Sequence, residues 1–168
     1  MPVELFSASS RITGQVASHH IHVRDELNDR RVSILLFHEM EVASLYDLGA
    51  PRVRSGEAWV DKEQILLAVP VKVKGTTSML TQRALQSRLG KNEHRISIDI
   101  PPFRVQGNFY FVGNLRIEDA LRRDQAPFGS LNYAEMTYLP DPSISFAVDE
   151  LVFNTAQVQM VCTEFEIE

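Results

Sequence analysis

Apolar and polar residues alternate most regularly in the second half of the chain. Between residues 103 and 111, apolar side chains and one glycine occupy every second position. A period of two is typical of a β-strand with one buried face. A weaker form of the pattern covers Phe6 and residues 12–16. Further strands are predicted at 32–46, 54–60, 64–73, 131–139, 144–148, 151–153 and 157–165.

Three other segments show helical spacing. Residues 23–29 and 117–124 each place a leucine four positions after their first apolar residue, so both side chains fall on one helix face. A longer helix is predicted in the connector at 75–90, where an apolar stripe ends at Gly90. We expect this stripe to pack between the two halves of the chain.

Four segments of the first half recur in the second half in the same order. Residues 11–14, 23–27, 37–40 and 60–65 match residues 104–107, 117–121, 133–136 and 153–158, at offsets of 93, 94, 96 and 93. Four collinear matches indicate a tandem duplication, whereas one alone would carry no weight. Gly14 and Gly107 occupy the same place inside the strand pattern, where a glycine indicates a bulge or bend.

The predicted fold is mainly β, with two tandem modules that are each a small β-barrel or curled sheet with one short helix. The modules are expected at 1–73 and 96–168, joined by a basic helical linker at 74–95. Closure or strong curling is favoured, because a small flat sheet leaves both of its edges exposed.

The repeated motifs resemble an uncharacterised family of small bacterial β domains. Arg11 and Gly14 resemble the Arg-x-x-Gly strand of that family, residues 24–28 its Arg/Asp/Leu/Asn helix, and residues 154–158 its closing Asn-x-x-Gln-Val strand. The closing strand is also similar to the second signature of Sm-like barrels, which implies ring assembly and RNA binding. Sm-like rings present basic loops to RNA, whereas both modules here are acidic, so we do not expect that function.

Charge is unevenly distributed along the chain. It carries 17 Lys and Arg against 22 Asp and Glu, a net charge of −5. Residues 72–95 hold a local charge of +5, so the rest of the chain carries −10. The acidic modules argue against nucleic acid as the main partner, although the basic connector leaves open a contact with nucleic acid or an acidic protein.

No apolar run approaches the roughly 20 residues that span a bilayer, and the first residues lack the features of a signal peptide. We therefore expect a cytoplasmic protein without a membrane span. The single cysteine, Cys162, lies in an alternating stretch and is predicted to be a half-buried structural thiol.

Two clusters are candidates for ligand chemistry. On a strand, His20 and His22 would share a face and could bind zinc or nickel with a third ligand such as His38 or Glu39. The second half has no histidine in the corresponding region, so an exposed loop is the alternative. An arginine pair follows the short helix in each half, namely Arg30 and Arg31 in the first half and Arg122 and Arg123 in the second. Such pairs either clamp a phosphate-bearing ligand such as a nucleotide or remain solvated.

No phosphate-binding glycine loop, nucleophile elbow or dinucleotide fingerprint is present in the sequence, and we expect no cofactor. The leading hypothesis is a non-enzymatic interaction or assembly module that binds another protein, with a homo-oligomer left open. Alternatives are a sensor of a small anionic ligand and a metal-dependent activity at His20 and His22. Four aromatic residues are assigned to the core, or to a partner surface if they prove exposed: Trp59, Phe128, Tyr133 and Tyr138.

Overall fold

A computed structural model describes residues 1–47, 49–71, 91–111, 113, 116–123 and 126–163. Within these ranges the protein is mainly β, as the sequence predicts. The helix predicted at 75–90 lies outside the described residues.

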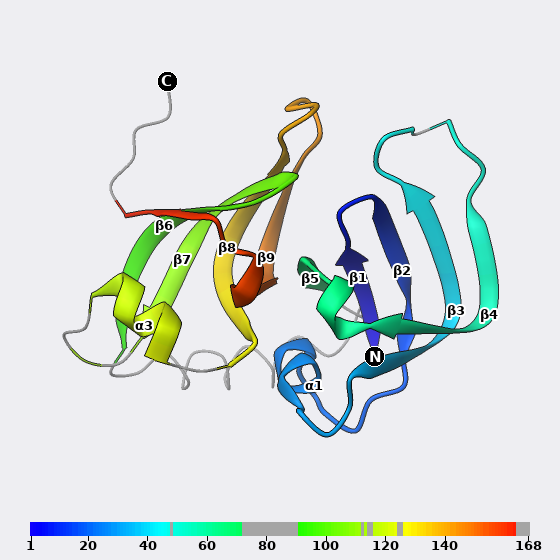
Figure 1. The fold of residues 1–168 in the computed structure, drawn as a ribbon, viewed down its shortest axis with the longest axis horizontal. Helices are drawn as coiled ribbons and strands as arrows, with labels where there is room; N and C mark the ends of the chain where they lie inside the picture. The colour runs from blue at the N-terminus through cyan, green and yellow to red at the C-terminus, as the bar shows by residue number, and fades with distance from the viewer. Residues whose placement is uncertain (48, 72–90, 112, 114–115, 124–125, 164–168) are drawn as a thin grey trace. The chain divides into compact units, whose positions relative to one another are not determined.

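The first series of elements spans residues 2–70 (Figure 1). Its strands pair antiparallel in the order β5-β1-β2-β3-β4, with α1 between β2 and β3 along the chain. The elements are β1 (Pro2–Phe6), β2 (Ser10–Val16), α1 (Val23–Asn28), β3 (Ile34–Ser44), β4 (Val53–Asp61), the 3₁₀ helix η1 (Lys62–Gln64) and β5 (Leu67–Pro70).

The second series spans residues 92–162 and has the same kinds of element in the same order. Its strands follow the order β10-β6-β7-β8-β9, which corresponds strand by strand to the first series. The elements are β6 (Asn92–Ile100), β7 (Phe103–Phe111), α3 (Ile117–Arg123), β8 (Phe128–Tyr138), β9 (Ser145–Asn154), η2 (Thr155–Gln157) and β10 (Met160–Cys162).

The described strands form one open sheet in the order β10-β6-β7-β8-β9-β5-β1-β2-β3-β4. The closed-barrel form of the prediction is therefore wrong for these strands. The physical reason lies at β5, which pairs with β9 instead of closing against β4 of its own series. Leu67 and Ala68 of β5 lie opposite Phe153 and Val152 of β9.

The contacts divide the chain into two compact units, each of which has its own core. The first unit contains residues 1–71 together with 126–130 and 150–157, which include the start of β8, the end of β9 and η2. Its core includes Leu5, Phe37, Phe128 and Val152. The remaining described residues from 91 onward form the second unit, whose fully buried side chains include Ile96, Ile98, Phe103, Leu131 and Met136.

Both predicted glycine bulges are confirmed. The register of β2 shifts between Thr13 and Gln15, and that of β7 shifts between Gln106 and Asn108. A Cβ atom at Gly14 would lie 3.2 Å from the Cα of Met40, and one at Gly107 would lie 3.2 Å from the Cα of Ala134. Neither site has room for a side chain without a shift of the neighbouring strand.

The bulges also correct one of the sequence matches. Gln15 lies opposite His38, and Asn108 lies opposite Asn132, so β3 and β8 correspond at an offset of 94 and not 96. Phe37 thus corresponds to Leu131. A slip of two residues keeps every side chain on the same face of a strand, so the alternation of the sequence does not detect it.

Three further boundaries differ from the prediction. β6 begins at Asn92, inside the segment predicted as linker at 74–95. The two segments predicted at 144–148 and 151–153 form one continuous strand, β9. A 3₁₀ turn precedes each closing strand, so β5 and β10 are shorter than the predicted strands at 64–73 and 157–165.

Candidate functional site

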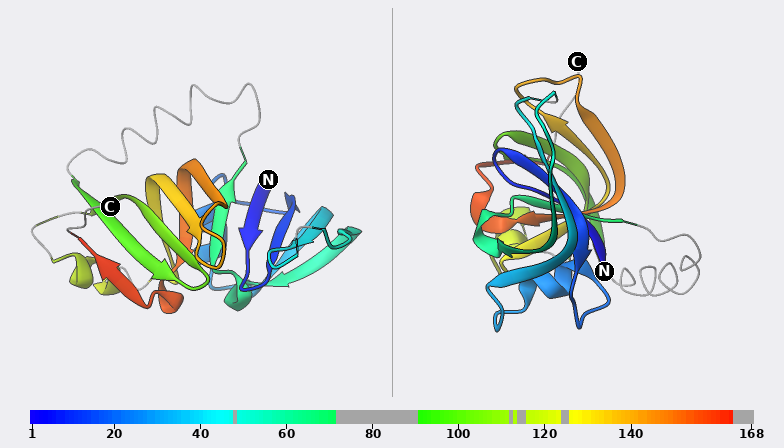
Figure 2. Two further views of the ribbon diagram at one scale, coloured as in Figure 1. Left: turned by 90° about the horizontal axis from the view of Figure 1, so that it is seen from above. Right: turned by 90° about the vertical axis from the view of Figure 1, so that its right-hand side faces the viewer.

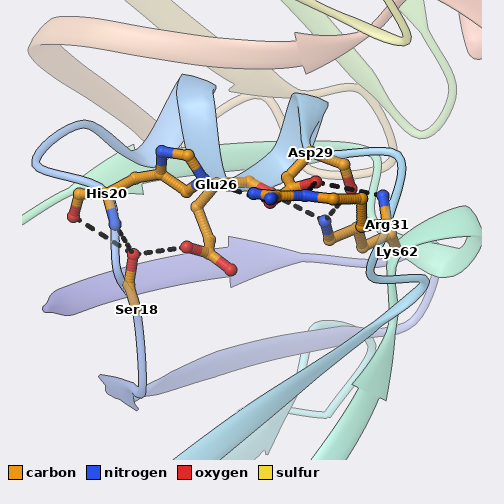
Figure 3. Close-up of polar contacts among 6 residues, drawn as sticks. All are labelled: Ser18, His20, Glu26, Asp29, Arg31 and Lys62. Carbon is orange, nitrogen blue, oxygen red and sulfur yellow. Dashed lines mark hydrogen bonds and ion pairs between the residues drawn. The ribbon is translucent and has the colours of Figure 1, made fainter.

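A buried lysine organises a polar cluster around α1 (Figure 3). Only 6% of Lys62 is exposed, and its ammonium donates to the backbone carbonyls of Glu26 (2.6 Å) and Asp29 (3.0 Å). These carbonyls end α1, which has no basic residue in its own last turn. Burial lowers the pKa of Lys62, while the carboxylates of Glu26 and Asp29 act in the opposite direction. Lys62 therefore supplies the positive charge that stabilises a helix C-terminus.

The other end of the cluster involves Ser18 and the buried residue Glu26. The Ser18 hydroxyl accepts a hydrogen bond from the backbone N–H of His20 at 2.9 Å and donates to the Glu26 carboxylate. Ser18 thus contacts the backbone of His20, while the His20 imidazole is directed to Asp29. Because the hydroxyl and the imidazole have different partners, these two residues do not form a nucleophile–base pair.

Asp29 joins the loop before α1 to the residues after it. Its carboxylate accepts from Nε (2.9 Å), Nη2 (2.7 Å) and the backbone N–H (3.0 Å) of Arg31, and Nε2 of His20 lies 3.2 Å from it. The hydrogen bonds from Arg31 lower the pKa of Asp29 well below its ordinary value, with a further contribution from His20. These contacts hold the loop and helix together, which is a structural role.

The histidines proposed as metal ligands occupy different environments. His22 is the N-cap residue of α1 and is exposed, while His20 contacts Asp29. His38 and Glu39 are exposed on β3. Within the described part of the chain, no three His, Cys, Asp or Glu side chains are grouped so as to hold a metal ion.

The arginine pairs follow α1 and end α3. Arg30 and Arg31 are exposed, and Arg31 is held by Asp29. Arg122 and Arg123 lie in the last turn of α3, and their side chains are not among those that the structure describes. The anionic-ligand hypothesis stays a prediction, and at Arg31 a ligand would have to displace Asp29. Cys162 is a free, half-buried thiol on β10, as predicted.

The aromatic residues divide between core and surface. Phe128 and Tyr138 are each 3% exposed and belong to the core, whereas Trp59 is 69% exposed and Tyr133 58% exposed. Trp59 lies on β4, directly opposite the half-buried Leu36 of β3. The two views of Figure 2 show β3 and β4 running side by side.

Ile34, Leu36 and Trp59 lie on one face of the β3–β4 pair, and we call these residues and the outer edge of β4 the β4 edge surface. Ile34 is 48% exposed, and its neighbour across the strands is Asp61, two residues from Trp59. Among the described strands, β4 pairs with β3 alone. Exposed apolar patches mark interaction sites, and an open strand edge offers unpaired backbone groups to an added strand.

The sequence identifies Trp59 as a conditional candidate but does not single out Ile34 or Lys62. Ile34 lies in an apolar stretch, and a strand pattern gives two faces without indicating which of them is covered. Lys62 follows an apparent strand and carries no signal for burial, since its partners are backbone carbonyls of residues more than 30 positions earlier.

No family model, curated protein or solved structure matches the chain. Among the described helices, none has the length and apolar character needed to cross a membrane.

Proposed function

We propose that the protein is a non-enzymatic interaction module that binds another protein chain at the β4 edge surface. The observation that supports this function best is the exposure of Trp59 on a strand that pairs on one side alone among the described strands. Tryptophan is enriched at the centres of protein interfaces, where burial of its large ring supplies much of the binding free energy. The open edge adds backbone donors and acceptors for an incoming strand.

The polar cluster supports a binding role over a catalytic one. The carboxylate of Asp29 and the ammonium of Lys62 are taken up by contacts that hold α1. A general base or nucleophile needs a free position within hydrogen-bonding reach of a substrate, whereas the polar atoms of this cluster bond to one another and to the backbone around α1.

We also propose that the two series of elements are a tandem duplication of one small β module. Support comes from corresponding registers: Phe6 lies opposite Arg11 in β1–β2, and Asp99 lies opposite Arg104 in β6–β7, 93 positions later in both strands. Each arginine also pairs with a carboxylate of the preceding strand, Glu4 for Arg11 and Asp99 for Arg104.

A charge on the proposed surface provides the test. Trp59→Lys should remove most of the binding to a partner without loss of stability, because the side chain is largely exposed. Ile21→Lys is the matched control, since Ile21 is 64% exposed and lies in the loop before α1. Proteins captured by the wild-type chain and by Ile21→Lys, but not by Trp59→Lys, are then purified and titrated. Equal binding by all three chains would refute the proposed surface.

A further inference from the structure

The described strands leave two sheet edges, β4 and β10. β4 is the fourth strand of the first series, and β10 is the fifth strand of the second series. The chain already contains one pairing between a fourth and a fifth strand of different series, which is the pairing of β9 with β5. The two open edges are thus a fourth strand and a fifth strand, which are the two kinds of strand that pair with each other inside the chain.

We propose that β4 of one chain pairs antiparallel with β10 of a second copy of this chain, in the register that β9 uses on β5. This inference rests on the proposed function and identifies the partner at the β4 edge surface. Phe153 lies opposite Leu67, and Val152 lies opposite Ala68. The closing strands correspond at an offset of 93, because Phe6 pairs with Leu67 as Asp99 pairs with Met160. β4 and β9 correspond at the same offset, because the 3₁₀ helices that follow them begin at Lys62 and Thr155.

The internal pairing therefore specifies the register of the external one. Val60 of the first chain lies opposite Met160 of the second chain, and Trp59 lies opposite Val161. In this arrangement β4 and β10 run antiparallel and present the same faces as β9 and β5 do. Trp59 then takes the position that Val152 holds in the internal pairing.

Exposure of the β4 edge surface supports this assignment. Trp59 is 69% exposed, whereas Val152, at the corresponding position of β9, is fully buried. Ile34 is 48% exposed, whereas Phe128, at the corresponding position of β8, is 3% exposed. Both buried residues belong to the core of the first unit, next to β5. Val152 and Phe128 are thus buried beside a fifth strand, whereas Trp59 and Ile34 are exposed at an edge where no fifth strand is described.

The closing strand of the second series shows the complementary exposure. Met160 is 43% exposed, while Leu67, at the corresponding position of β5, is fully buried. Val161 is half-buried, while Ala68 is fully buried. A β4 strand from another chain would cover the side chains of β10 as β9 covers those of β5.

Such an interface is head-to-tail, because each chain offers β4 to one neighbour and β10 to another. Repetition of one such contact gives a ring if the rotation between chains closes, and a filament if it does not. Either product leaves fewer open strand edges than the separate chains do.

The interface between chains should be weaker than the internal pairing. The amide of Asn154, at the end of β9, donates to the carbonyl of Ile65 at 3.0 Å. At the corresponding end of β4 is Asp61, whose carboxylate has no N–H to donate. Its Oδ1 accepts from the backbone N–H of Glu63, as Oδ1 of Asn154 accepts from Ala156. Asp61→Asn would keep this cap and supply the missing donor.

Sedimentation velocity over a range of concentrations tests self-association of the full chain. Trp59→Lys should raise the apparent dissociation constant by about thirtyfold or more, the effect of losing one interface hot spot. Asp61→Asn should lower it by about fivefold, as expected for one added hydrogen bond. Ile21→Lys should leave it unchanged. Circular dichroism of each variant verifies that the fold is intact.

A crosslinking experiment tests the register. Cys162 is the only cysteine of the chain, and the proposed register, extended by one residue pair, places it opposite Ala58 of the neighbouring chain. One protein carries Ala58→Cys and Cys162→Ser, and it is mixed with wild-type chain and a short bis-maleimide. The mixture should yield covalent dimers, because opposed side chains on paired strands are close. Either protein alone should yield none, because its cysteines are not opposed.

Three results would overturn the proposal. The first result is that the wild-type chain and the Asp61→Asn chain both stay monomeric at every soluble concentration. Another is self-association that Trp59→Lys leaves unchanged, and the third is a mixture that yields no more dimer than its separate components. If these results occur while a different protein binds wild type and not Trp59→Lys, the proposed function stands and only the identity of the partner is refuted.

Discussion

The ring of Phe153 fills the space that a side chain at Gly129 would need. A Cβ atom built on Gly129 would lie 2.5 Å from Cζ of Phe153 and 2.9 Å from Cε1. At the corresponding positions of the first series, Leu35 lies opposite Val60. The second series thus has a glycine beside a phenylalanine where the first series has a leucine beside a valine. The two pairs fill the core with different combinations of small and large side chains.

We predict that Gly129→Ala destabilises the protein by about 1–3 kcal/mol, the usual cost of forcing extra volume into a packed core. Gly56→Ala is the control, since a Cβ there would meet no atom within 4 Å. Urea denaturation of both variants measures the effect. Combining Gly129→Ala with Phe153→Leu should cost less than the sum of the two single changes, because the smaller side chain makes room for the added methyl.

Strands and helices were predictable because their periods differ. The alternation at 103–111 became β7, and the helices at 23–29 and 117–124 became α1 and α3 with small shifts at their ends. Gly14 and Gly107 marked both bulges correctly, because a glycine weakens a regular strand and is favoured where the strand bends or a neighbouring backbone comes close.

Strand partners were not predictable in the same way. Nothing in the residues of β5 distinguishes pairing with β4 from pairing with β9, since both present apolar side chains at the matching positions. β6 was missed although Ile96, Ile98 and Ile100 alternate with polar residues, because that alternation covers five residues only and the first half of the strand, Asn92 to Arg95, is entirely polar or charged and exposed. Exposure of Trp59 and Ile34 depends on which strand lies beside β4, so the candidate surface needed the topology as well as the sequence.

Lys62 is predicted to contribute to stability through the end of α1. Lys62→Met keeps much of the side-chain volume and removes the donor to Glu26 and Asp29, which should cost about 1.5–3 kcal/mol, the value of a hydrogen bond to a charged group. Because the folded-state pKa of Lys62 is lowered from 10.5, the wild-type protein should gain stability relative to the variant as pH rises toward that value. Thermal denaturation between neutral pH and pH 10.5 tests both statements.

Asp29 is predicted to contribute stability that acid removes. Its folded-state pKa lies below the ordinary value of 3.8, so its contribution is present above that pH and is lost as pH falls through the lowered pKa. Asp29→Asn should therefore melt below the wild-type protein at neutral pH, and the difference should shrink as pH falls below 3.8. A difference in melting temperature that stays constant into strong acid would contradict this role.

Asn154 is predicted to hold the end of β9 against the residues that precede β5. Its amide donates to Ile65, and its backbone N–H donates to Leu66 at 2.9 Å. Asn154→Asp keeps the acceptor for Ala156 but sets a carboxylate against the Ile65 carbonyl, which should cost about 1–3 kcal/mol for a buried group without its partner. Hydrogen exchange, corrected for the intrinsic rate of the new residue, should show faster opening at the backbone N–H of residue 154, which bonds to the Leu66 carbonyl, and slower or unchanged exchange there would contradict the prediction.

Trp59 provides a direct optical measure of the β4 edge surface, because it is the only tryptophan in the chain. At low concentration its emission should be that of a solvated indole and strongly quenched by acrylamide, since 69% of the residue is exposed. Occupation of the surface by any chain should shift the emission to shorter wavelength and protect it from the quencher. Asp61→Asn should bring this shift to a lower protein concentration, whereas a variant distant from the surface, Ile21→Lys, should follow the wild-type curve. Emission of a buried indole at the highest dilution would show that another segment of the same chain covers Trp59.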